Sequence, residues 1–281
     1  AVKLFELRSK ATEALDEAGI ERARYAADLI ISKVLSLTRI ELVTRENENI
    51  ESPMYDEVFA MVEKRLKRVP LSYILGESEF YGYKFEVGEG CLIPRPETEL
   101  LVENMLTLVK FGTFADWCTG SGCIGITMLL ENADYRGYGV DSSPEALCWA
   151  EKNRELHGMN DRFTLIRCSE PKEAGIEHGS LDFIIANPPY IPSREIDSLM
   201  EDVRDNEPKE ALDGGVDGLD VFIKIIDAAS ALIKKGGYLG FETAGDSQAE
   251  HLLKIVPECF VLTNKIYDYN GILRHIIWQI S

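Results

Sequence analysis

The tetrapeptide Asn187-Pro188-Pro189-Tyr190 follows the apolar run LDFIIA and combines residue types that could activate a planar NH₂ group. The side-chain oxygen of Asn187 and the carbonyl oxygen of Pro188 can accept the two N–H bonds and turn the nitrogen lone pair towards an electrophile. Neither proline has an N–H that would repel such a substrate, and each forces the residue before it into extended geometry. Tyr190 offers an aromatic face for a planar group that gains positive charge. This chemistry suits methyl transfer to an amide or an arylamine nitrogen and does not distinguish between them; a strand-ending turn is the alternative.

A glycine-rich turn, CTGSGCIG at 118–125, follows the apolar run FADW. Gly120 and Gly122 remove Cβ atoms where a ligand must approach the backbone, and exposed N–H groups of the turn could hold a carboxylate or a phosphate. The GxGxxG pattern fits a dinucleotide site as well as a methionine-nucleoside site. An NAD-dependent oxidoreductase therefore stays open on this motif alone.

Acidic residues near the turn favour S-adenosylmethionine over NAD. Asp116 precedes Gly120 by four residues and could face the positive end of a methionine moiety, directly or through water. Asp141 ends the next apolar run, where a carboxylate can accept both ribose hydroxyls of either cofactor, or else cap the following helix. Glu170, after the third run, could accept a hydrogen bond from an adenine amine, or lie in a solvated loop.

The elements that must position these residues follow from the apolar pattern. Strand-like runs alternate with helical segments, which predicts an α/β fold with a parallel, doubly wound sheet and a terminal antiparallel strand. These runs lie at 111–117, 134–141, 162–169, 181–188, 236–243 and 274–280. Ligands of such sheets bind at the carboxyl ends of the strands, so both motifs are expected at one edge.

The remaining sequence predicts two further parts. Residues 1–75 carry apolar positions at helical spacing and are expected to form a small helical, substrate-recognition bundle. Residues 76–93 alternate aromatic and polar side chains and predict a connecting β-hairpin, which leaves 94–281 for the methyltransferase domain. The polar, glycine-rich segment 193–218 predicts a lid or wall of the substrate crevice, with a tolerated surface insertion as the alternative.

Composition excludes several classes of protein. The formal charge of −18 over 281 residues argues against a protein whose whole surface grips a nucleic-acid backbone. No apolar run approaches the roughly 20 residues of a membrane span, so we expect a cytoplasmic protein. Six cysteines show no CxxC pair and no histidine at metal spacing, and four histidines have no nucleophilic partner in a motif. We therefore expect neither a metal site nor a catalytic triad.

Together with Ile93-Pro94-Arg95-Pro96-Glu97-Thr98-Glu99, the glycine-rich turn and Asn187–Tyr190 resemble the bacterial HemK/PrmC family, protein-(glutamine-N5) methyltransferases acting on peptide chain release factors. Further similar stretches lie at 73–76, 80–82, 207–219 and 241–242 and at Gln248, so the resemblance covers most of the chain. It implies a helical N-terminal domain joined by a β-hairpin to a Rossmann-like, seven-stranded S-adenosylmethionine-dependent domain. The implied substrate is the glutamine of a release factor's Gly-Gly-Gln motif. We expect a monomer that binds neither nucleic acid nor membrane.

The resemblance also assigns site residues. Asn187, Pro188, Pro189 and Tyr190 would hold the substrate amide. The cofactor would contact Cys118, Thr119, Gly120, Ser121, Gly122, Asp141, Ser169, Glu170 and Asn187, in addition to Asp116. Arg95, Glu97 and Thr98 would line its methionine end, unless they only begin a helix.

Some residues depart from the family pattern. Cys118 stands where these enzymes usually have glycine, Ser169 where aspartate is common, and 271–274 replace a more polar stretch. The second departure leaves open which of residues 169 and 170 reaches the adenine. The main alternative function is methylation of adenine N6 or another exocyclic amine in nucleic acid. A catalytically silent module that docks a peptide is a further alternative.

Overall fold

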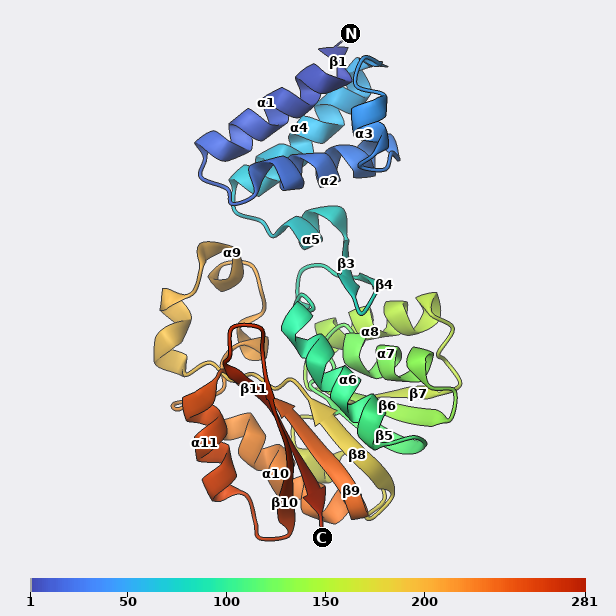
Figure 1. The fold of residues 1–281 in the computed structure, drawn as a ribbon, viewed down its shortest axis with the longest axis vertical. Coiled ribbons are helices and arrows are strands. Elements are labelled where there is room, and N and C mark those ends of the chain that lie inside the picture. Colours follow the sequence, from blue (N-terminus) through green and yellow to red (C-terminus); the bar gives the residue numbers. More distant parts are fainter. Residues whose placement is uncertain (1) are drawn as a thin grey trace. The chain divides into compact units, whose positions relative to one another are not determined.

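The computed structural model describes residues 2–281, and the chain forms two compact units (Figure 1). The first comprises Ala1–Glu77 with Met200–Asn206, and the second comprises Ser78–Leu199 with Glu207–Ser281. The chain therefore leaves the second unit and returns to it within the segment 193–218.

The first unit is a helical bundle, as predicted. Its elements are β1 (Val2–Lys3), α1 (Leu4–Glu17), α2 (Ala23–Leu35), α3 (Glu41–Thr44), β2 (Asn49–Ile50), α4 (Ser52–Leu66), α5 (Leu71–Leu75) and α9 (Glu201–Arg204). Leu4, Leu7 and Leu15 of α1 are fully buried because their spacing places them on one helix face. Beside them, Nε and Nη2 of Arg8 each donate to Asp28 at 3.0 Å, which compensates the two buried charges.

The short helix α9 joins this unit through ion pairs. Nη2 of Arg65 lies 2.6 Å from Oδ2 of Asp202, and the side-chain amide of Asn206 donates to the carbonyl of Arg68 at 3.1 Å. Arg65 lies in the last turn of α4 and Arg68 just after this helix, so both contacts join the end of α4 to residues distant in the chain.

The second unit is built on a seven-stranded sheet with the order β10-β11-β9-β8-β5-β6-β7. Its strands are β5 (Gly112–Trp117), β6 (Tyr135–Asp141), β7 (Phe163–Arg167), β8 (Leu181–Ala186), β9 (Ile233–Glu242), β10 (Phe260–Tyr267) and β11 (Leu273–Ile280). Strands β7, β6, β5, β8 and β9 are parallel, whereas β11 and β10 are antiparallel. The predicted α/β sheet with a terminal antiparallel strand is confirmed. β10 was missed: this edge strand has only a short apolar run, 259–262, and most of its side chains are exposed.

Helices and a hairpin surround the sheet. These elements are β3 (Glu77–Phe80), β4 (Tyr83–Glu86), η1 (Pro96–Thr98), α6 (Glu99–Leu108), α7 (Cys123–Glu131), α8 (Pro144–Leu156), η2 (Pro171–Glu173), η3 (Ser193–Ser198), η4 (Lys209–Ala211), α10 (Asp220–Leu232) and α11 (Asp246–Ile255). Tyr81 and Gly82 join β3 to β4 with φ of 54° and 76°, as a two-residue hairpin turn requires.

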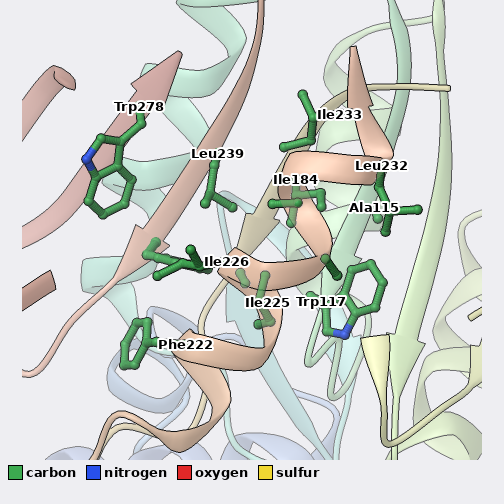
Figure 2. Packing of buried hydrophobic residues seen from close by; sticks show 14 of the residues in the cluster. Ala115, Trp117, Ile184, Phe222, Ile225, Ile226, Leu232, Ile233, Leu239 and Trp278 are labelled. Carbon is green, nitrogen blue, oxygen red and sulfur yellow. The ribbon is translucent and has the colours of Figure 1, made fainter. Parts of the chain in front are cut away.

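Apolar clusters pack on both faces of the sheet. Figure 2 shows the cluster in which Phe222, Ile225 and Ile226 of α10 pack with sheet residues such as Ile184 and Leu239. On the opposite face, Phe114 of β5 stacks on Phe183 of β8, with ring centroids 4.9 Å apart. Side chains alternate along a strand, so neighbouring residues supply the two clusters.

This topology creates the place for a site. The chain runs from β5 to β6 on one side, while β8 lies on the other side of β5, so the strand order reverses there. Loops after β5 and β8 therefore diverge and leave a crevice at their carboxyl ends. The glycine-rich turn and Asn187–Tyr190 are those two loops.

Candidate active site

A cavity of about 270 Å³ lies at this edge of the sheet, wholly within the second unit. The ends of β5, β6, β7 and β8 supply its floor, and other loops supply its walls. Lining residues include Leu92, Ile93, Pro94, Arg95, Thr98, Trp117, Cys118, Thr119, Gly120, Ser121, Val140, Asp141, Ser142, Ser143, Cys168, Ser169, Asn187, Pro189, Pro208, Glu210, Ala211, Asp213 and Lys224. Both motifs found in the sequence thus border one space.

The glycine-rich turn is shaped by left-handed backbone at Cys118, Gly120 and Gly122, with φ of 60°, 55° and 80°. A Cβ added at Gly120 would meet no atom within 4 Å, so this position opens onto the cavity. The N–H groups of Thr119, Gly120 and Gly122 donate to Val140 O, Asp141 Oδ2 and Thr119 O. Contrary to our expectation, these three N–H groups hold the turn together and are not free for an anion.

Asp116 does not lie where the sequence predicts it. Its carboxylate is fully buried and does not line the cavity. Oδ2 accepts hydrogen bonds from the Thr119 hydroxyl at 2.6 Å and from the Gly125 N–H in the first turn of α7 at 2.9 Å. Burial raises the pKa of Asp116 to about 7. The carboxylate thus fixes the turn from below, whereas the sequence suggested a direct or water-mediated contact with a cationic ligand.

Asp141 ends β6 and lines the cavity, as predicted. Its Oδ2 accepts from the Gly120 N–H at 2.9 Å, and Oδ1 accepts from the Ser143 N–H at 3.0 Å. Burial raises its pKa despite these bonds. The carboxylate is therefore held in one orientation by the two loops that it joins. Asp141 does not cap α8, because the N-cap is Ser143, whose hydroxyl accepts from the Ala146 N–H at 3.2 Å.

Ser169 and Glu170, in the loop after β7, differ in their relation to the cavity. Ser169 lines the cavity, whereas Glu170 does not. Oε1 of Glu170 lies 2.6 Å from Nζ of Lys224 on α10, in an ion pair of which both side chains are about half exposed. Of these two residues, only Ser169 therefore borders the cavity.

Asn187 and Pro189 line the cavity, while Pro188 is buried beside them. Within residues 2–281, neither the amide oxygen of Asn187 nor the carbonyl oxygen of Pro188 accepts a hydrogen bond. Tyr190 packs partly against the core, and burial raises the pKa of its hydroxyl, so the phenol stays neutral. Two adjacent acceptors without partners are what binding of an NH₂ group needs.

A buried polar network behind Asn187 was not predicted. Its side-chain nitrogen donates to the Thr98 hydroxyl at 3.3 Å, and this hydroxyl donates to Oε2 of Glu242 at 2.5 Å. Nε2 of His275 lies 3.3 Å from the same oxygen, and the Tyr190 hydroxyl lies 3.5 Å from Oε1. The stretch 241–242 carried part of the family resemblance, but only the fold places Glu242, at the end of β9, beside Asn187.

Arg95 and Glu97 are also separated by the structure. Nη2 of Arg95 lies 2.6 Å from Oε1 of the buried Glu207, whose Oε2 accepts from the Ile93 N–H at 3.1 Å. Arg95 lines the cavity, whereas Glu97 is exposed and does not. Of the three residues expected at the methionine end, Arg95 and Thr98 therefore border the space. Glu207 holds the wall that contains them.

The segment 193–218 forms part of the cavity wall through residues after Glu207. The N–H of Ile191 donates to Leu212 O, and that of Gly214 donates to Ile191 O. Nε2 of Gln248 donates to Tyr190 O at 3.0 Å and to Gly218 O at 3.1 Å. These bonds tie the wall to the loop that carries Asn187, so the segment is more than a tolerated surface insertion.

Cys118 occupies left-handed backbone that L residues adopt at a cost of about 1 kcal/mol. We therefore expect Cys118→Gly to be more stable than Cys118→Ala by about 1 kcal/mol, although alanine is usually the more stable residue. Both variants lose the sulfur, so the difference between their free energies of unfolding in urea isolates the backbone strain. An alanine variant as stable as the glycine variant would contradict this.

Within residues 2–281, no group of three or more His, Cys, Asp or Glu side chains could hold a metal ion. No helix in this part of the chain is long and apolar enough to cross a membrane.

Comparisons with known proteins agree with the geometry. Residues 6–76 match the PrmC N-terminal domain, and residues 96–207 match the methyltransferase small domain. A release factor glutamine methyltransferase from Thermodesulfovibrio yellowstonii is 37% identical over 91% of this chain and 92% of its own length. Proteins of the same name from Clostridium acetobutylicum (36%, 98% of each chain) and Bacillus anthracis (32%, 100% of each chain) are similar over their full or nearly full length. On the strength of two matched domains and full-length similarity, the chain belongs to the release factor glutamine methyltransferase family.

Proposed function

We propose that this enzyme transfers the methyl group of S-adenosylmethionine to the side-chain amide nitrogen (N5) of the glutamine in a release factor's Gly-Gly-Gln motif. The observation that carries the proposal is the pair of unpartnered acceptors, Asn187 Oδ1 and Pro188 O, on the loop whose Asn187 and Pro189 line the cavity. A primary amide has two N–H bonds, and the two acceptors can take both of them. The same proposal places the enzyme in the cytoplasm, where translation ends.

The cavity residues fit S-adenosylmethionine. Asp141 presents a fixed carboxylate that can accept the ribose hydroxyls, and Trp117 and Val140 add apolar surface beside it. Ser169 borders the same space, and Gly120 leaves room for close approach. When bound, this cofactor supplies a methyl group on a sulfonium sulfur. Asp116 does not reach the cavity and would act only by holding the turn.

The residues around Asn187 would activate the substrate by orientation. With both N–H bonds held, the lone pair of the amide nitrogen turns out of conjugation and towards the methyl carbon. When bound, the cofactor would supply the methyl group that replaces one hydrogen of the amide NH₂, with the displaced proton leaving to water and S-adenosylhomocysteine remaining as the product. Tyr190 tolerates the positive charge that builds on the nitrogen, since its neutral ring presents a negative π surface. Positioning and charge stabilisation would provide most of the rate.

Mass spectrometry of a release factor after incubation with enzyme and S-adenosylmethionine tests this function. We expect one added methyl group on the Gly-Gly-Gln glutamine. DNA and ribosomal RNA, offered in parallel with labelled cofactor, test methylation of an exocyclic amine. Label that appears only in nucleic acid would overturn the proposal.

The cofactor assignment predicts a difference between two carboxylates. Asp141→Asn is expected to weaken binding of S-adenosylhomocysteine about 10-fold, because an amide cannot accept from both ribose hydroxyls and the Gly120 N–H. Glu170→Gln is expected to change it less than about 3-fold, since a half-exposed ion pair contributes little. Calorimetric titration measures both. Equal losses would show that Glu170 binds the ligand, and tight binding of NAD alone would exclude the cofactor proposed.

A further inference from the structure

In the buried network behind Asn187, the order of hydrogen-bond donors and acceptors determines how the Asn187 amide is oriented, and this orientation bears on the reaction. We propose that Glu242, through the hydroxyl of Thr98, fixes the Asn187 amide so that its oxygen, and not its NH₂ group, faces the substrate. This inference rests on the proposed function and adds two positioning residues to it. Neither Glu242 nor Thr98 needs to touch the reacting atoms.

Both residues are held in place by burial. Thr98 is the last residue of η1 and Glu242 the last residue of β9, and each is only 2% exposed. Three donors converge on the Glu242 carboxylate: the Thr98 hydroxyl, the Tyr190 hydroxyl and Nε2 of His275. Convergent donors stabilise an acceptor-only group in a buried site. The carboxylate is therefore the fixed end of the network.

The carboxylate determines where the Thr98 proton points. A hydroxyl has one proton, and at 2.5 Å that of Thr98 is used by Oε2 of Glu242. Towards Asn187, Thr98 Oγ1 can then only accept a hydrogen bond. The Asn187 side chain has one donor group and one acceptor, so its nitrogen must face Thr98, as the 3.3 Å contact shows. Its oxygen, which lies in the same amide plane on the other side of Cγ, then points away from Thr98.

The opposite orientation would oppose catalysis. An amide flip exchanges oxygen and nitrogen with almost no change of shape, so packing alone selects between them weakly. With the NH₂ group of Asn187 turned to the substrate, two donors would meet and one of the two acceptors would be lost. The Glu242–Thr98 pair prevents this flip. In the flipped amide, two acceptors, Asn187 Oδ1 and Thr98 Oγ1, would be in contact with no proton between them.

Thr98→Val and Thr98→Ser form a matched pair that tests the proposal. Valine keeps the shape and removes the hydroxyl, so we expect kcat to fall about 10-fold while KM for the release factor and affinity for S-adenosylhomocysteine stay within about 3-fold. Serine keeps the hydroxyl and should restore most of kcat. Glu242→Met frees the Thr98 proton to bond the Asn187 oxygen, and its kcat should fall as in Thr98→Val. Equal kcat for the valine and serine variants would overturn the proposal, as would a Glu242→Met enzyme that retains kcat.

Nuclear magnetic resonance gives a readout that needs no substrate. In protein labelled with ¹⁵N-asparagine, the Asn187 side-chain NH₂ signals, identified by their loss in Asn187→Asp, should shift in Thr98→Val and return in Thr98→Ser. Unchanged signals in Thr98→Val would overturn the inference. Because this measurement does not depend on methyl transfer, it decides the amide orientation even where release factor methylation itself fails.

Discussion

Asn187→Ala is expected to lower kcat for methylation of a release factor by about 100-fold or more. The substitution removes one of the two free acceptors of the loop after β8, the one whose residue lines the cavity, and leaves the Pro188 carbonyl alone. A singly held NH₂ group can rotate, and its lone pair returns to conjugation with the carbonyl. The loss should therefore appear when enzyme is saturated with both substrates, in single-turnover measurements with labelled cofactor.

Two controls separate this effect from a loss of folding or of cofactor. Asn160→Ala changes an exposed asparagine of the same unit and should keep the wild-type rate. Titration with S-adenosylhomocysteine reports whether Asn187→Ala still binds the cofactor. Undiminished methyl transfer by Asn187→Ala would refute the acceptor mechanism, even though membership of the family would stand.

The parts of the fold that sequence predicts are those with a local signal. Apolar runs that are buried on both faces mark β5, β6 and β8, and the glycines after β5 mark a turn that needs left-handed backbone. Strand β10 was not predicted because it is a mostly exposed edge strand whose apolar run, 259–262, is short. The sequence also did not predict that residues 200–206 belong to the first unit. This depends on the ion pair between Arg65 and Asp202, and no local sequence pattern predicts a pairing between such distant residues.

The candidate site likewise contains residues whose place the sequence predicts and residues whose place it does not. Asp141 ends β6 and Asn187 directly follows β8, so topology alone brings them to one edge of the sheet. Side-chain direction is not fixed by position along the chain, and this is why Asp116 lies beneath the turn and Glu170 turns to Lys224. Glu242 and Glu207 act through partners distant in sequence, so their roles emerge only from contacts.

Asp116 makes the stability of the second unit depend on pH. Burial raises its pKa to about 7 in the folded protein, whereas the pKa of an exposed aspartate is about 3.9. Between about pH 4 and pH 7 the folded state therefore holds a proton that the unfolded state has lost. Protonation favours folding in this window, so the free energy of unfolding falls as pH rises through it. A difference of about 3 pKa units corresponds to about 4 kcal/mol at most.

Asp116→Asn should remove this dependence. The amide oxygen can take over the bonds from the Thr119 hydroxyl and the Gly125 N–H, and the NH₂ group replaces Oδ1, which has no partner within residues 2–281. Urea unfolding between about pH 5 and pH 8 should show the wild type losing stability relative to the variant by a few kcal/mol.

Asp134→Asn, at an exposed position of the same unit, should keep a constant difference from the wild type. Parallel curves for wild type and Asp116→Asn would mean that Asp116 is already ionised at low pH. The carboxylate would then hold the glycine-rich turn as a charged acceptor, and its buried charge would have to be stabilised by the N–H of Gly125 and the hydroxyl of Thr119 alone.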